Sequence, residues 1–348
     1  MFQQLFRGRF LYLTFGLLVL LLYWRELRHH ASRPQAMPEM SAPAPARPHW
    51  PQELDLAAAQ QRLAHRPLLA FVASLLSFFI TGMSLGGVGL TGWALATGRL
   101  RQAWRLPPRR FPPWSFAELW RLVMLTAILA ALLPFAHLGL VALQPEREPD
   151  THAWLVGSML VLDTCVIFAI FAFAAGKRRS IWRAVGFSGR PLWPSIIAGL
   201  RGYVGVFPWL FALLFLIVEI AQRLGFQPPL EPIHELLFEE HRHAMLALTA
   251  LLACGVGPVA EELLFRGVVY PTLRRRTGPV IAMLVSAAVF SAIHTSLVGF
   301  VPIMGLGVLL AYLYERTGSL ISSLTVHIVH NTLLFGAAML FRQILVPS

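Results

Sequence analysis

Charged residues and cysteines are both scarce in this sequence. Only 13% of its 348 residues are charged, about half of the roughly 25% that is usual in globular proteins, and the mean hydropathy is +0.62. This composition excludes a soluble globular protein. The two cysteines, Cys165 and Cys254, lie within apolar runs, which excludes a disulfide scaffold and a CxxC metal site. We expect both to be small buried hydrophobic residues.

Acidic residues are also few, at 17 against 29 basic ones. The basic residues gather in short loops between apolar runs, a pattern typical of the cytoplasmic loops of membrane proteins. No recognised nucleic-acid-binding fold accompanies the charge, so we expect no nucleic-acid partner. We expect the basic loops 99–110, 177–190 and 274–276 to be cytoplasmic and the acidic loops 146–150 and 231–240 to lie outside. The amino terminus would then be cytoplasmic and the carboxyl terminus outside.

The apolar runs are continuous and do not alternate with polar residues, which excludes a membrane β-barrel. Phe10–Trp24 is flanked by arginines and lacks a small-residue cleavage site, so it predicts a retained anchor helix rather than a signal peptide. Several other runs exceed the ~18 residues that indicate a membrane span. The predicted spans are Leu68–Leu95, Leu119–Leu143, Trp154–Ala175, Ser195–Gln222, Ala244–Phe265, Val280–Leu297, Val298–Tyr314 and Leu320–Phe341. The predicted fold is an all-α, polytopic membrane helix bundle with about eight spanning helices plus an N-terminal anchor helix.

The predicted organisation has four regions. Residues 1–30 form the anchor helix, and 31–66 form a linker whose Pro/Ala-rich part cannot pack a core. Within the linker, Glu53–Ala64 predicts a short helix on the membrane surface. Residues 67–243 are accessory transmembrane helices, and 244–341 form the catalytic core.

Ionisable residues inside the apolar runs need an explanation, because a charge at membrane depth costs about 2.5–3.5 kcal/mol on insertion scales. Glu261 and Glu262 are adjacent, and Arg266 follows Glu262 by four residues, so the latter two share one helix face. The alternative is an ordinary surface ion pair at a helix end. However, Glu262 precedes Arg274 by 12 residues, or about 18 Å of helix, which is too deep for a surface pair.

Two further apolar runs carry polar side chains at similar depth. His294 lies in one, and His327 and Asn331 lie four residues apart on one face of another. A glutamate base, histidines and an amide donor are the groups needed for water attack on a carbonyl, because the base takes a proton while the donors stabilise the oxyanion. A single histidine in an apolar helix is usually a hydrogen-bonded packing residue, and this is the alternative for His294. His330 is one position from Asn331 and points elsewhere, so we assign it a structural role. Asp163 either pairs with another helix or lines a substrate path.

At these positions the chain resembles the CPBP family of intramembrane proteases, which includes type II CAAX prenyl endopeptidases and bacteriocin-processing or immunity proteins. The family motifs EExxxR, FxxxH and HxxxN correspond to EELLFR at 261–266, FSAIH at 290–294 and HIVHN at 327–331. The resemblance covers roughly Ala244 to Leu340. It implies that Glu261 activates water with the help of His294, that the Glu–Arg pair described above supports Glu261, and that His327 and Asn331 stabilise the oxyanion.

The family is often described as metalloproteases, and the requirement for a metal is open. Glu261, His294 and His327 could supply a His₂Glu zinc site. Arg266 beside the site would repel a cation, and a glutamate can activate water unaided. We therefore favour no cofactor, with zinc as the alternative.

The sequence thus predicts a multi-pass protein of the cell membrane, in a bacterium the inner membrane, that hydrolyses a peptide bond of a membrane-associated substrate. A CAAX-like substrate is implied by the resemblance alone. The expected partners are membrane lipids and a protein or peptide substrate. The main alternative is a non-proteolytic bacteriocin-immunity or scaffold protein on the same fold. A transporter with a proton relay is a third possibility, but internal repeats are missing.

Overall fold

The computed structural model describes residues 56–99, 102, 105–107, 111–143, 150–177, 180–187, 191–225, 232–296 and 298–345. Every regular element in these ranges is a helix, so the predicted all-α fold class is confirmed. The predicted anchor helix and the Pro/Ala-rich part of the linker lie outside the described residues. The short surface helix predicted at Glu53–Ala64 corresponds to α3 (Leu56–His65).

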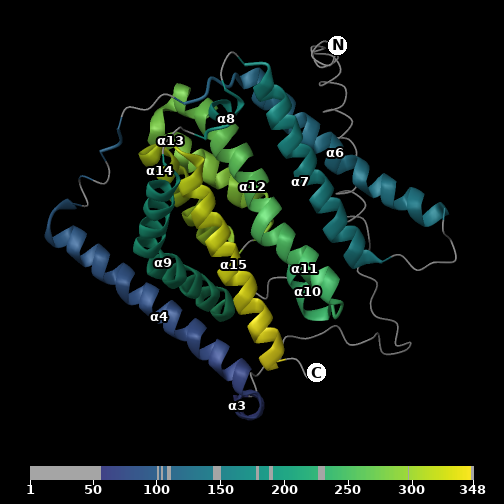
Figure 1. Cartoon of the computed structure of the whole chain (residues 1–348), viewed down its shortest axis with the longest axis vertical. Coiled ribbons are helices and arrows are strands. Elements are labelled where there is room, and N and C mark those ends of the chain that lie inside the picture. The colour runs from purple at the N-terminus through teal and green to yellow at the C-terminus, as the bar shows by residue number, and fades with distance from the viewer. Residues whose placement is uncertain are drawn as a thin grey trace.

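Five long apolar helices match predicted spans closely. They are α4 (Pro67–Ala96), α6 (Phe116–Leu143), α7 (Thr151–Ala175), α9 (Leu192–Arg223) and α15 (Leu320–Leu345). Helix α4 packs on α9, α6 packs on α7, and α9 packs on α15 (Figure 1). Their outer surfaces carry large exposed apolar side chains such as Phe78 and Leu143. Apolar exposure of this extent indicates contact with lipid.

The first motif and the start of the second lie on one helical path between His243 and Ala292. Its segments are α11 (His243–Leu251), the π-helical turn η1 (Leu252–Val256), α12 (Gly257–Glu262), the π-helical turn η2 (Leu263–Val269) and α13 (Tyr270–Ala292). A π-helical turn is rare and is frequently found at functional sites. Both π turns flank the short α12 that carries the two glutamates.

The chain reverses direction at Gly278, inside the stretch assigned to α13. Gly278 has a φ of 80° and a ψ of 174°, which glycine adopts readily, and Pro279 cannot continue the helical hydrogen bonds. Phe290 lies 12 residues after Gly278 and contacts Arg266, which lies 12 residues before it. The two arms therefore form a hairpin, and this agrees with the two separate helices predicted from the sequence.

Six helices of the described residues are long and apolar enough to cross a membrane, against eight predicted spans. The difference has two causes. The path from His243 to Ala292 counts once, although it contains two predicted spans. The predicted span Val298–Tyr314 corresponds to α14 (Phe300–Thr317), which is not among the six. The chain is a multi-pass membrane protein in either count.

The end of the second hairpin arm corrects one predicted boundary. The predicted span Val280–Leu297 ends as a helix at Ala292. Thr295 has a φ of 53°, a left-handed conformation that a right-handed helix cannot contain. His294 therefore lies in the turn after α13, not within a helix.

Helix α14 approaches α13 closely because Gly307 has no side chain. A Cβ at this position would lie 3.0 Å from Cβ of Ala287 and 3.3 Å from Cδ1 of Phe290, closer than real side chains normally pack. The close approach brings the backbone of α14 against the second hairpin arm and places the Gly307 carbonyl within hydrogen-bond distance of Arg266 on the first arm. As shown below, the Gly307 carbonyl then becomes part of the glutamate site.

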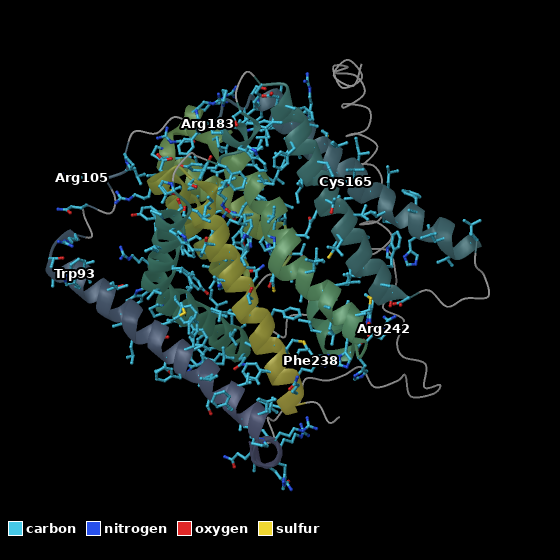
Figure 2. All side chains as sticks on the ribbon, in the orientation of Figure 1. Trp93, Arg105, Cys165, Arg183, Phe238 and Arg242 are labelled. Atoms are coloured by element: carbon cyan, nitrogen blue, oxygen red, sulfur yellow. The ribbon has the colours of Figure 1, made fainter. Side chains whose placement is uncertain are left out.

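Charged residues gather at both ends of the bundle, and Figure 2 shows Arg242 at one of them. Arg242 forms ion pairs with Asp150 and Glu240, which joins the start of α7 to the loop before α11. Hydrogen bonds from Arg242 lower the pKa of Glu240 to about 2 and also lower the pKa of Asp150. Both carboxylates therefore stay ionised at neutral pH.

The described parts of the predicted basic loops lie at the other end, where Figure 2 shows Arg105 and Arg183. There Arg274 donates hydrogen bonds of 2.7 and 2.8 Å to both carboxylate oxygens of Glu315 on α14. Tyr270 donates a further hydrogen bond of 2.6 Å to Glu315. The basic ends of the hairpin and of α14 are thus tied together. Which end faces the cytoplasm stays a prediction.

Candidate functional site

A fully buried ion pair lies beneath the accessible part of the site. Glu262 at the end of α12 and Arg266 on η2 lie four residues apart, and both side chains are only 1% exposed. Arg266 donates a hydrogen bond of 2.8 Å to Oε1 of Glu262 and another of 3.1 Å to the Gly307 carbonyl. Its guanidinium also lies 4.6 Å from the ring centre of Phe290. The i,i+4 pairing predicted from the sequence is confirmed.

His327 on α15 connects this ion pair to Glu261. Its Nδ1 lies 3.1 Å from Oε1 of Glu262, and its Nε2 lies 3.4 Å from Oε2 of Glu261. An ionised carboxylate can only accept hydrogen bonds, so Nδ1 of His327 carries a proton toward Glu262. The imidazole is therefore fixed between the two glutamates, with its second nitrogen facing Glu261.

Glu261 differs from its neighbours because it is accessible. Its side chain is 28% exposed, whereas His327 is 2% exposed. Its Oε2 is nonetheless buried and has no hydrogen-bond partner among the described residues. A carboxylate with an unpaired oxygen and an open side is suited to hold and deprotonate a water molecule.

Phe290 packs the second and third motifs together. Its ring centre lies 4.7 Å from that of His294 and 5.7 Å from that of His327. His294 donates from Nδ1 to the Phe290 carbonyl at 2.7 Å; this is the tautomer that a carbonyl acceptor requires. In the neutral ring, Nε2 of His294 is then left as an acceptor. No contact between His294 and Glu261 is seen.

Asn331 is engaged by the backbone of η1. Its amide nitrogen donates a hydrogen bond of 2.8 Å to the Ala253 carbonyl, so Asn331 fixes the π turn that precedes α12. One of its two amide protons stays available for another acceptor. Its neighbour His330 faces α9, where Tyr203 lies 2.9 Å from its Nδ1, in agreement with the packing role expected for His330.

The structure thus joins Glu261, Glu262, Arg266 and His327 through a chain of contacts. His294 reaches this group through Phe290, whereas Asn331 is bound to the Ala253 carbonyl. Sequence patterns had no signal for the two backbone carbonyls that complete the site, at Ala253 and Gly307. A backbone acceptor leaves no residue-type signature, and only the packing of α14 and the π turn reveals it.

The same side chains do not form a metal site. No group of three or more His, Cys, Asp or Glu residues with the arrangement of a metal site occurs in the part of the chain that the structure describes. Of the set considered from the sequence, His327 lies 3.4 Å from Glu261, whereas Nδ1 of His294 is bound to the Phe290 carbonyl. These residues are not arranged as a preformed zinc site.

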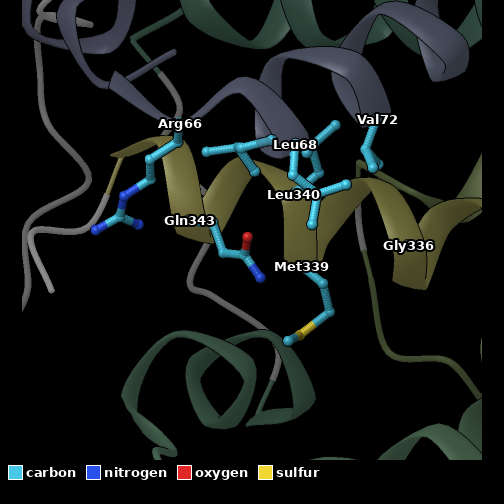
Figure 3. A pocket seen from close by; sticks show the side chains of 8 residues that line it. Arg66, Leu68, Val72, Gly336, Met339, Leu340 and Gln343 are labelled. Carbon is cyan, nitrogen blue, oxygen red and sulfur yellow. The ribbon is translucent and has the colours of Figure 1, made fainter. Parts of the chain in front are cut away.

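A groove of about 480 Å³ lies elsewhere, between the start of α4 and the end of α15 (Figure 3). It is lined by apolar side chains such as Val72 and Leu340, with Arg66 and Gln343 at one end. None of the motif residues lines it. We therefore assign it no part in the chemistry.

Comparison with known proteins supports a protease family. Residues 243–333 match the family model described as "Type II CAAX prenyl endopeptidase Rce1-like". This segment resembles the CPBP proteases. The CPBP-like segment covers the two hairpin arms, α14 and the part of α15 that carries His327 and Asn331. The helices before residue 243 lie outside the match.

One curated relative is the Bacillus subtilis (strain 168) protein named "Putative membrane peptidase YdiL". It is 29% identical over 85 residues, which is 24% of this chain and 35% of the relative. The chain therefore spans about a third of the length of the curated relative that it matches. No solved structure matches the chain.

Proposed function

We propose that this protein is an intramembrane endopeptidase in which Glu261 activates the attacking water. The observation that carries the proposal is an accessible glutamate, Glu261, next to the buried Glu262–Arg266 ion pair. Glu261 is 28% exposed, while Glu262 and Arg266 are 1% exposed. The resemblance of residues 243–333 to a CAAX endopeptidase family supports the same reaction class.

The proposed reaction begins with a water molecule held by Glu261 and by Nε2 of His294. Glu261 takes a proton from the water as its oxygen attacks the carbonyl carbon of the scissile peptide bond. His327 packs against Glu261, with its Nε2 3.4 Å from Oε2 of Glu261. The buried Glu262–Arg266 pair fixes His327 in turn, because Glu262 accepts from its Nδ1.

The oxyanion that forms on the carbonyl needs hydrogen-bond donors. The second amide proton of Asn331 supplies one, since the first is bound to the Ala253 carbonyl. A preorganised donor of this kind contributes about 10²–10³-fold to the rate. His327 is the other donor that the family resemblance implies, in the state where its Nε2 is protonated.

The substrate is a membrane-associated protein or peptide, and we propose that it carries a prenylated CAAX-type carboxyl end. The test is cleavage of a quenched fluorescent peptide with a farnesylated CAAX end, using the full chain in proteoliposomes. We expect cleavage that mass spectrometry assigns to one peptide bond, with isotopically labelled water incorporated into the new carboxyl group. The same peptide without the farnesyl group is the control for lipid recognition. No cleavage of either peptide would favour the scaffold or immunity alternative.

Chelation should leave the activity of the purified protein intact. No described group of side chains has the geometry of a metal site, and Arg266 binds Glu262 next to Glu261, where its charge would repel a cation. The measurement is cleavage before and after treatment with a zinc chelator, together with elemental analysis of the active protein. One zinc per chain, with activity lost to the chelator and restored by zinc, would show that the metal-free mechanism is wrong.

A further inference from the structure

A third carboxyl group lies beside Glu261, on a helix outside the matched segment. Asp163 is on α7, which packs along α12. A Cβ at Gly257 would lie 3.6 Å from Oδ2 of Asp163. Gly257 precedes Glu261 by four residues, so Asp163 faces the same side of α12 as Glu261. The carboxyl groups of Asp163 and Glu261 interact electrostatically.

Asp163 has no cationic neighbour to balance it. Among the described residues, no hydrogen bond or ion pair is found for its side chain, and Glu261 is the only charged group that acts on it. Arg266 is occupied by Glu262 and the Gly307 carbonyl. Two carboxyl groups therefore lie on the same side of α12, and no cation is bound to Asp163 among the described residues.

Two neighbouring carboxylates in an apolar environment do not both ionise at moderate cost, and such pairs hold one proton between them. We propose that Asp163 and Glu261 form such a pair, in which Asp163 holds the proton and delivers it to the leaving nitrogen. The accessible side of α12 would then carry both an acid and a base. The delivery step rests on the proposed function.

Protons taken up and released in this step are equal in number. Glu261 takes one proton from water as the carbon–oxygen bond forms. Asp163 gives one proton to the nitrogen as the carbon–nitrogen bond breaks, and the electron pair of that bond stays on nitrogen. The proton on Glu261 then passes to Asp163, which restores the starting pair. The net reaction consumes one water and releases one carboxylic acid and one amine.

Asp163→Asn tests the acid role with the farnesylated peptide. We expect kcat to fall by about 10²-fold or more, the contribution of a general acid, with KM little changed. Asp163→Glu should restore most of kcat, because it returns a proton donor. Thr164→Val is the matched control, since Thr164 is the next residue of α7 and is exposed. Wild-type kcat in Asp163→Asn, or no rescue in Asp163→Glu, would overturn the acid role.

Infrared spectroscopy tests the shared proton without substrate. The protein in lipid vesicles at neutral pH should show the C=O stretch of a protonated carboxylic acid. Asp163→Asn should remove this band, Glu261→Gln should change its frequency or intensity, and Thr164→Val should leave it unchanged. A band that is indifferent to Glu261→Gln would disprove the pair. If the wild-type protein fails to cleave the peptide, the proposed function fails, while the infrared result still decides on the pair.

Discussion

Replacing Glu261 by Gln should abolish detectable peptide cleavage, a fall in kcat of at least about 10²–10⁴-fold. Glutamine has the same shape but cannot take a proton from water. The variant should still fold, because Glu261 is 28% exposed and makes one contact of 3.4 Å with His327. The measurement is steady-state cleavage of the farnesylated peptide in proteoliposomes, with yield and thermal unfolding recorded for each variant.

Glu219→Gln is the control for Glu261→Gln. Glu219 lies on another apolar helix, α9, and pairs with Arg223 at an exposed position. Its replacement should leave turnover unchanged. If Glu261→Gln cleaves at a rate close to that of the wild type, Glu261 is not the base, and the scaffold alternative gains support where any biological phenotype also persists.

Replacing Arg266 by Met should destabilise the protein by about 3–5 kcal/mol, the usual cost of removing one partner from a buried ion pair. The change leaves Glu262 charged and 1% exposed, without its guanidinium partner. It also removes the donor to the Gly307 carbonyl. The measurement is the free energy of unfolding by chemical denaturation in detergent micelles.

The chain offers a matched pair for comparison, because Glu219 and Arg223 have the same i,i+4 spacing at an exposed site. Arg223→Met should change the free energy of unfolding by only about 0–1 kcal/mol. Adding Glu262→Gln to Arg266→Met should recover part of the lost stability, because it removes the uncompensated charge. Equal effects of Arg266→Met and Arg223→Met would show that burial of the first pair has no energetic consequence.

Hydropathy was sufficient to predict most of the helices. The predicted span Leu68–Leu95 corresponds to the helix Pro67–Ala96. The predicted span Trp154–Ala175 corresponds to the helix Thr151–Ala175. Long apolar runs in a membrane have no alternative to the helix, because every backbone group must be satisfied within the segment. The prediction was wrong at the end of α13, where the apolar run continues to Leu297 but the helix ends at Ala292. Hydropathy does not detect the left-handed turn at Thr295.

Helix periodicity predicts contacts between residues of one helix, and this part of the candidate site could be predicted from the sequence. The spacing of Glu262 and Arg266 predicted their contact, and the structure has it at 2.8 Å. The contact of His327 with both glutamates depends on the packing of α15 against α12, which no spacing within one helix encodes. The proximity of Asp163 to Gly257 likewise depends on where α7 crosses α12. Sequence analysis identified Asp163 as a buried charge but could not name its neighbour.

The two π-helical turns set the rotational phase of everything that follows them. An α-helix turns by about 100° per residue, whereas a π turn spreads each hydrogen bond over one more residue. Deleting one residue from η2 would let the α-helical ladder re-form and would leave the following helix near its present phase, because the widened turn holds one extra residue. Deleting one residue between Tyr270 and Arg274, where the helix is α-helical, would instead rotate Arg274 by about 100° and turn it away from Glu315. A relative could thus keep all three motifs letter for letter and still have lost the ion pair that ties its hairpin to α14.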